Sequence, residues 1–144
     1  MTGILLTTDL STESQRAFAP VRSLAQRLNL PVTLLSVIED VPFEAMAAGV
    51  LAVYPDRTQV RRDHEQALAA LADKLGRDVC RQCTVVEAAD VPGAIVGQAQ
   101  KMAADYIAMA THGRSGLRRL LLGSIAEQVV QHAHVPVLLY PPPA

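Results

Sequence analysis

The sequence contains no tryptophan, few aromatic residues and only two cysteines. Aromatic side chains make up 3% of its 144 residues, and most of the hydrophobic residues are alanine, leucine and valine. This composition favours helices packed on a sheet of branched residues over a β-sandwich. Two cysteines are too few for a disulfide scaffold, but a chain of this length buries roughly 68–70% of its unfolded surface without one. We therefore expect a single domain over residues 1–144.

Neither sign of charge dominates, and no long hydrophobic run is present. Thirteen Lys and Arg residues oppose 14 Asp and Glu residues, so the net charge of −1 does not suit nucleic acid or an anionic membrane surface. The most hydrophobic short stretch, residues 120–122, is far shorter than the ~18 residues of a membrane span. The chain begins with Met1, Thr2 and Gly3 and has no basic leader. These features predict a soluble cytoplasmic protein that binds neither nucleic acid nor membrane.

Short apolar runs alternate with helical patterns along the chain. The runs predict five strands, over Ile4–Thr8, Val32–Ile38, Cys83–Ala88, Tyr106–Ala110 and Pro136–Tyr140. Apolar residues at helical spacing predict helices in the four intervals between them, including Arg57–Leu75 and Ser124–His132. Residues 41–56 show no clear pattern and stay unassigned. Strands separated by helices imply a doubly wound parallel sheet, in an α/β fold with helices on both faces.

Several residues mark where these helices begin and end. Thr12 and Gln15 form a capping-box pattern that opens the first helix, which stops before Asn29. The second helix ends near Gly76, and Asp90 can cap the third. The expected boundaries therefore rest on local hydrogen bonding as well as on periodicity.

Two loops at the carboxyl edge of this sheet are candidates for ligand binding, since doubly wound sheets bind ligands there. The first loop follows strand one and holds Thr7, Thr8 and Asp9; the second follows strand four and runs from Met109 through Thr111–Gly116 to Gly123 and Ser124. Gly113 and Gly116 let backbone approach a ligand closely, and Arg114 adds positive charge. The free N–H groups of the helix that Gly123 and Ser124 open attract anions. The second loop thus predicts a phosphate site.

A reading without any ligand explains part of the same pattern. Ser124 and Glu127 also form a Ser-x-x-Glu capping box, which would satisfy those N–H groups by itself. On spacing alone, the phosphate site and the ligand-free capping box are about equally well supported. The loop matches neither the Walker A motif nor the dinucleotide-binding glycine motif, so neither mechanism applies.

Over almost its whole length the chain resembles the universal stress protein family. The resemblance rests on residues 4–9, residues 32–38, Thr111–Gly116 with Gly123 and Ser124, and residues 135–139. Family members that bind ATP carry the pattern Gly, two residues, Gly, nine residues, Gly, then Ser or Thr. Gly113, Gly123 and Ser124 match its last three elements, and Ala110 replaces the first glycine.

The resemblance implies an adenine nucleotide, ATP or else AMP or ADP, bound with Mg²⁺. Asp9 would contact the ribose or adenine region, backbone around Val37 would read the adenine edge, and Met109 and Ala110 would flank the sugar. The phosphates would be surrounded by His112, Gly113, Gly123, Ser124 and Ile125. The implied fold is that of the adenine nucleotide alpha hydrolase-like proteins, with strand order 3-2-1-4-5. The family also suggests a homodimer that pairs the last strand, through Val137, Leu138, Leu139 and Tyr140.

The leading hypothesis is a non-enzymatic, ATP-binding regulator of the stress response. The alternatives are a slow ATPase or phosphotransferase, with His112 and Asp9 as the nearby candidates, and a nucleotide-free dimeric adaptor. We interpret His64 as part of a solvated face, and His132 and His134 as facing the end of their helix. Asp9 could be only a turn residue. The spacing of Cys80 and Cys83 is compatible with a redox or zinc site. A zinc site needs four ligands, however, and the sequence has no second cysteine pair, so we interpret Cys83 as a core residue.

Overall fold

The computed structural model describes residues 3–40, 56–111 and 122–143, and these contain a five-stranded parallel sheet. The strands are β1 (Ile4–Thr7), β2 (Val32–Glu39), β3 (Cys80–Ala88), β4 (Tyr106–Ala110) and β5 (Val137–Tyr140). Their order is β3-β2-β1-β4-β5, and every neighbouring pair is parallel. The predicted α/β fold and strand order are confirmed.

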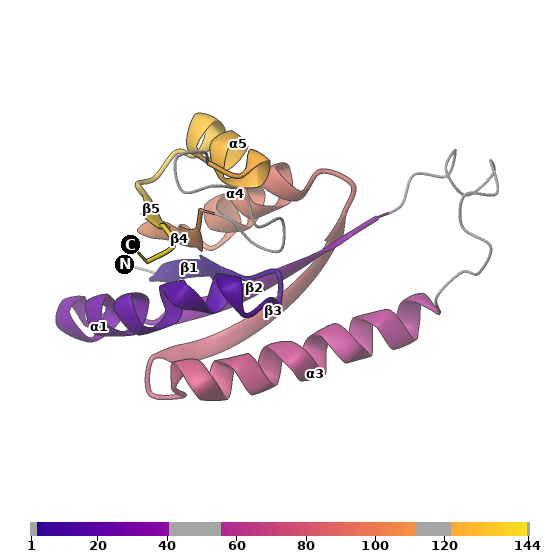
Figure 1. The fold of residues 1–144 in the computed structure, drawn as a ribbon, viewed down its shortest axis with the longest axis horizontal. Helices are drawn as coiled ribbons and strands as arrows, with labels where there is room; N and C mark the ends of the chain where they lie inside the picture. The colour runs from indigo at the N-terminus through magenta and orange to yellow at the C-terminus, as the bar shows by residue number, and fades with distance from the viewer. Residues whose placement is uncertain (1–2, 41–55, 112–121, 144) are drawn as a thin grey trace.

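Helices cover both faces of the sheet. They are the 3₁₀ helix η1 (Glu13–Ala17) and the α-helices α1 (Phe18–Leu28), α3 (Arg57–Leu75), α4 (Val91–Lys101) and α5 (Ser124–His132). In Figure 1, α1 and α3 lie on one face, and α4 and α5 lie on the other. Two hydrophobic clusters fill these layers. One includes Leu6, Leu34 and Leu68 beneath α1 and α3, and the other includes Leu35 and Ile107 beneath α4 and α5.

Side-chain and backbone caps set most helix boundaries. The Asp90 carboxylate accepts a hydrogen bond from the Gly93 N–H at 3.1 Å, as the sequence predicted. Asp56 likewise caps α3 by accepting from the Thr58 N–H at 3.0 Å. Asn29 ends α1 in the left-handed conformation, with φ of 54°. Gly76 ends α3 with φ of 109°, in a region where a side chain would be strained.

Two local predictions were wrong. Thr12 makes no side-chain cap hydrogen bond, and the chain begins this region with a 3₁₀ helix. The Ser11 hydroxyl accepts from the Ser14 N–H instead, at 3.2 Å. Strand β3 begins at Cys80, three residues before the predicted start at Cys83. Residues 41–55, which the sequence left unassigned, lie outside the described residues.

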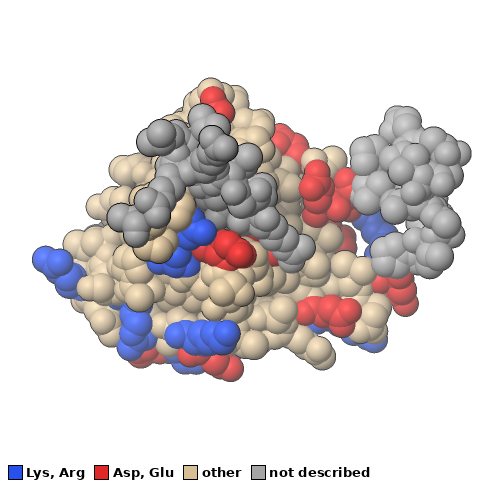
Figure 2. All heavy atoms as spheres, in the orientation of Figure 1, with Lys and Arg blue, Asp and Glu red and all other residues tan. Residues whose placement is uncertain are grey.

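The described surface shows no concentration of one charge on the face drawn in Figure 2. There, positive and negative side chains are scattered among uncharged ones. Within the described residues, no helix is both long and apolar enough to cross a membrane.

Candidate functional site

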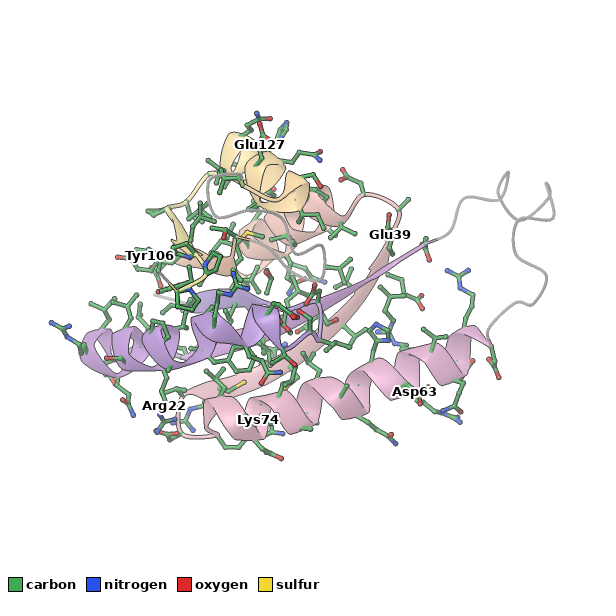
Figure 3. All side chains as sticks on the ribbon, in the orientation of Figure 1. Arg22, Glu39, Asp63, Lys74, Tyr106 and Glu127 are labelled. Carbon is green, nitrogen blue, oxygen red and sulfur yellow. The ribbon has the colours of Figure 1, made fainter. Side chains whose placement is uncertain are left out.

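A cavity of about 560 Å³ opens at the carboxyl edge of the sheet, a volume typical of small-molecule sites. Glu39, at the end of β2, marks this edge in Figure 3, and Tyr106 lies at the opposite end of the sheet. The cavity is lined by residues of β1, β2, β4, α3, α4 and α5 and of the loops that follow β1 and β4. It therefore lies where parallel α/β sheets bind ligands.

Nine of the predicted site residues line this one cavity. They are Thr7, Thr8, Asp9, Val37, Met109, Ala110, Gly123, Ser124 and Ile125. His112, Gly113, Arg114 and Gly116 lie outside the described residues. The structure adds lining residues that were not among the predicted site residues: Ser14, Leu35, Ser36, Ile38, Glu39, His64, Val91, Ile95, Thr111 and Ala126.

The loop after β1 is held by its own side chains. Asp9 accepts hydrogen bonds from the Ser11 N–H, at 2.9 Å, and from the Ser11 hydroxyl. Ser14 donates to the Ser11 carbonyl, so the Thr8 hydroxyl must donate to Ser14, across 2.7 Å. Thr8 also accepts from the Leu10 N–H at 3.0 Å, with Leu10 in the left-handed region at φ of 69°. The Thr8 hydroxyl therefore fixes the loop, and the Asp9 carboxylate is held in place at the cavity wall.

The backbone of Val37 faces the cavity beyond the end of β1. The register between β1 and β2 ends at Thr7 and Leu35, and the Leu35 carbonyl accepts the last bond, from the Thr8 N–H at 2.9 Å. In a parallel strand, alternate residues direct both backbone groups to the same side, so Val37 points its N–H and C=O toward β1, as Leu35 does. Since β1 has ended, this donor and acceptor form an open edge that a planar heterocycle can use.

The amino end of α5 supplies N–H groups to the other end of the cavity. Gly123 is the N-cap residue and has no side-chain cap, so the capping box predicted for Ser124 and Glu127 does not form. Ser124 is instead the first helical residue, and the N–H groups of Ser124, Ile125 and Ala126 precede the first intrahelical bond, from Glu127 to Gly123. The helix dipole adds a partial positive charge here, which favours an anion.

A backbone hydrogen bond closes the loop between β4 and α5. The Gly123 N–H donates to the Thr111 carbonyl at 2.9 Å, and the Thr111 N–H donates to Tyr140 of β5 at 3.2 Å. These bonds bring the end of β4 next to the start of α5, although 11 residues lie between Thr111 and Gly123 in the sequence. Met109 and Ala110 therefore lie between the open edge of Val37 and the anion site. Ala110 adopts ordinary strand geometry with negative φ.

The sequence suggested that His64 belongs to a solvated face, and this interpretation was wrong. It is half-buried, lines the cavity and places Nδ1 3.0 Å from the Val60 carbonyl oxygen. A signal for this position was present, because His64 precedes Leu68 by one helical turn on the face that packs against the sheet. The neighbouring strand residue Ser36 is also in the cavity wall and is 1% exposed.

The two cysteines and the histidine at the end of α5 lie away from the cavity lining. Cys80 is buried in the core and Cys83 is half-buried against it, and both are free thiols. Burial first, and the neighbouring Cys83 second, raise the pKa of Cys80 to about 11, so this thiol stays protonated at neutral pH. His132 Nδ1 lies 2.8 Å from the Gln128 carbonyl oxygen in the last turn of α5, as expected.

Comparison with known proteins agrees with this geometry. The family model described as "Universal stress protein family" matches residues 1–141. The chain belongs to the universal stress protein family. A universal stress protein of Methanocaldococcus jannaschii is 30% identical over 141 residues, which cover 97% of this chain and 82% of that protein.

Solved universal stress proteins share the fold at lower sequence identity. The Archaeoglobus fulgidus protein, solved in complex with dAMP, is 16% identical, covers 95% of each chain and gives a TM-score of 0.68. A universal stress protein solved in complex with cAMP is 19% identical, with a TM-score of 0.63 over 96% of this chain and 94% of that one. Both of those complexes hold an adenine nucleotide.

Proposed function

We propose that this universal stress protein binds ATP in the cavity at the carboxyl edge of its sheet and acts as a nucleotide-dependent regulator. The observation that carries the proposal is that three complementary features line one cavity of about 560 Å³: the open backbone edge of Val37, the fixed carboxylate of Asp9 and the uncapped start of α5. Two universal stress proteins of the same fold were solved with cAMP and dAMP, which supports an adenine nucleotide.

Each feature suits one part of the nucleotide. The Val37 N–H and C=O match the ring nitrogen and amino group of adenine, and the Asp9 carboxylate can accept from ribose hydroxyls. The free N–H groups of Ser124 and Ile125 suit phosphate oxygens. Met109 and Ala110 supply the wall between the base and the phosphates.

Mg²⁺ fits the site only together with the phosphates. No three His, Cys, Asp or Glu side chains gather into a possible metal group among the residues that the structure describes. Mg²⁺ usually binds through one or two carboxylates, waters and substrate phosphates, so the Asp9 carboxylate and the nucleotide would share it. When bound, the ion would neutralise phosphate charge.

We assign a regulatory role because a hydrogen bond connects the cavity wall to β5, the strand that the family resemblance expects to pair in a homodimer. The Thr111 N–H, at the cavity wall, donates to the Tyr140 carbonyl of that strand. The adaptor alternative assumed that Ala110 blocks the ribose and that the Ser124–Glu127 box fills the phosphate site, and this box does not form. The ATPase alternative is an outcome of the experiment below.

The test is to denature the purified protein, identify any released nucleotide by chromatography, and titrate the stripped protein with ATP and Mg²⁺ in a calorimeter. Bound or micromolar-binding ATP that stays intact for hours supports a regulator. Hydrolysis over the same time would favour a slow ATPase, and the absence of both bound nucleotide and binding heat would overturn the proposal.

Gly123→Val tests the phosphate end. Gly123 has φ of −59° and ψ of 152°, which valine adopts readily, so the fold should persist. The new side chain would stand beside the N–H groups that face the phosphates and should abolish ATP binding. Gly97→Val in α4 is the matched control, because a Cβ there meets nothing within 4 Å. Unchanged ATP affinity in Gly123→Val would show that the pocket is wrong.

A further inference from the structure

His64 faces the sheet close to the carboxyl end of β2. Arg57, the first residue of α3, forms an ion pair with Asp40, which directly follows β2, at 2.6 Å. The start of α3 therefore lies beside the end of that strand. His64 precedes the fully buried Leu68 by one turn, whereas Asp63 is exposed and lies on the side of α3 away from the sheet in Figure 3. The His64 ring thus closes the α3 side of the cavity.

One hydrogen bond fixes the chemistry that His64 presents. Its Nδ1 lies 3.0 Å from the Val60 carbonyl oxygen, and a carbonyl oxygen can only accept. Nδ1 must therefore carry the proton, and in the neutral ring Nε2 is left as an acceptor. Within the described residues, Nε2 has no hydrogen-bond partner. The cavity wall thus contains an acceptor of fixed polarity.

Ser36 adds a hydroxyl on the same side. Leu34 and Ile38 belong to the cluster beneath α1 and α3, so Ser36, between them in the alternation of β2, points to the α3 side as well. The residue is 1% exposed and lines the cavity, and its hydroxyl forms no hydrogen bond in the described part of the chain. A hydroxyl in the cavity wall can donate to a ligand atom or accept from one.

We propose that His64 and Ser36 make the cavity selective for a 6-amino purine, an inference that rests on the proposed nucleotide binding. The adenine amino group has two hydrogens: the Val37 carbonyl accepts one and His64 Nε2 accepts the other, while Ser36 donates to a ring nitrogen. Hypoxanthine and guanine carry an oxygen acceptor in place of the amino group. That oxygen would face the two acceptors, which leaves buried acceptors unpaired.

The experiment measures the affinity of the stripped protein for ATP and for inosine triphosphate by calorimetry at about pH 8. The unaltered protein should prefer ATP by about tenfold or more. In His64→Gln the side-chain amide can turn to donate or to accept, so inosine triphosphate should bind more tightly and the preference should fall to about threefold or less. A damaged fold would not produce this gain in affinity.

Two further variants complete the test. Glu65→Gln changes the next residue of α3, which is exposed and paired with Arg61 at 3.2 Å, and should leave the preference unchanged. His64→Phe keeps a ring without an acceptor and should weaken ATP binding about fivefold without any gain for inosine triphosphate. If His64→Gln binds ATP and keeps the original preference, the role of His64 is wrong and the proposed nucleotide site stands. If the unaltered protein binds neither nucleotide, both proposals fail.

Discussion

At the scale of the residue, Ala110 is where the chain departs from the glycine of the family's ATP-binding pattern. Its backbone is ordinary strand, paired with Tyr140, so the alanine causes no conformational strain. Its methyl group, however, takes up space in the cavity wall where we place the sugar. We expect Ala110→Gly to bind ATP about threefold to tenfold more tightly, and to lose roughly 0.5–1 kcal/mol of unfolding free energy because glycine weakens a strand. Calorimetry and denaturant unfolding measure the two effects.

Ala108→Gly is the control for this change. Ala108 lies two residues earlier in β4 and is fully buried beneath α1 and α3, away from the cavity lining. It should lose stability without any change in ATP affinity. Equal affinities in Ala110→Gly and the unaltered protein would mean that the methyl group does not contact the sugar.

The two cysteines should differ in reactivity. Cys80 is 2% exposed and its pKa is raised to about 11, chiefly by burial, whereas Cys83 is half-buried at its edge of the core. Because the thiolate is the reactive form, we expect iodoacetamide at about pH 8 to modify Cys83 first and Cys80 only after denaturant is added. Peptide mass spectrometry distinguishes the two sites. Equal rates without denaturant would contradict the burial of Cys80.

Some residues with a local role were predictable from the sequence, although the caps expected at Thr12 and Ser124 do not form, and residues whose role is tertiary were not predictable. Asp90 and Asn29 act through backbone groups within a few positions, so their capping roles followed from sequence alone. His64 and Ser36 gain their roles only because α3 packs beside the end of β2, which periodicity does not specify. The motif glycine at 123 was found, but only the structure shows that it, rather than Ser124, is the N-cap.

At the scale of the element, β3, the strand whose start was predicted three residues too late, is an edge strand. Arg81 and Gln82 are exposed in β3, so the sequence pattern of its first residues is that of a polar loop. In the structure, however, Cys80 already pairs with Val32 of β2. The central strands β1, β2 and β4 are buried on both faces and appear as continuous apolar runs. Sequence patterns therefore located the central strands better than the start of β3.

An exposed ion pair that should depend on pH joins α1 to the turn that follows α3. The two terminal guanidinium nitrogens of Arg22 donate to Asp78, at 2.6 and 2.9 Å, and one of them also donates to the Leu75 carbonyl at 2.9 Å. The hydrogen bond from Arg22 holds the pKa of Asp78 below its ordinary value of 3.8. Because the pKa of Asp78 is lower in the folded protein, its ionised form stabilises the fold at pH values above 3.8. This stabilisation is lost as the pH falls through the folded-state pKa.

Asp78→Asn should therefore flatten the acid limb of the stability profile below about pH 4, with little change in shape near pH 7. Urea unfolding of both proteins at pH values from below 4 to 7 measures the two stability profiles. The difference should shrink in high salt, since exposed pairs are screened. Asp73→Asn removes the ion pair between α3 and Arg77, two residues beyond its end, and is the comparison variant. An unchanged acid limb in Asp78→Asn would mean that this link does not contribute.

At the scale of the whole molecule, the cavity and the edge strand β5 share one hydrogen-bonded path. Ala110 and Thr111 lie in the cavity wall, Ala110 pairs with Tyr140, and the Thr111 N–H donates to the same residue. The strand order that creates this proximity was predictable from the alternation of strands and helices together with the family resemblance. The consequence, that a nucleotide and a partner at β5 would act on the same strand, required the register.

The homodimer that the family resemblance suggests can be tested through the backbone of β5. Pro136 and Tyr140 direct their carbonyls to β4, so the alternating residues Val137 and Leu139 direct theirs, and their N–H groups, to the open edge. Leu139→Pro removes one outward N–H without breaking a bond to β4, and proline is tolerated on edge strands. We expect this variant to be monomeric by analytical ultracentrifugation. Leu139→Ala, which loses the same side chain and keeps the N–H, should remain dimeric.

Nucleotide and dimer should then be coupled in both directions. If ATP acts through Thr111 and Tyr140, it shifts the dimer dissociation constant by some factor, and dimerisation must shift ATP affinity by the same factor. A regulator of this kind should show about a fivefold or larger effect, the usual lower range for allosteric coupling. Sedimentation with and without ATP measures the effect of ATP on the dimer dissociation constant. Calorimetry on Leu139→Pro and Leu139→Ala measures the effect of dimerisation on ATP affinity. Dimers in both variants would place the interface elsewhere, and equal ATP affinities in monomer and dimer would remove β5 as the output of the site.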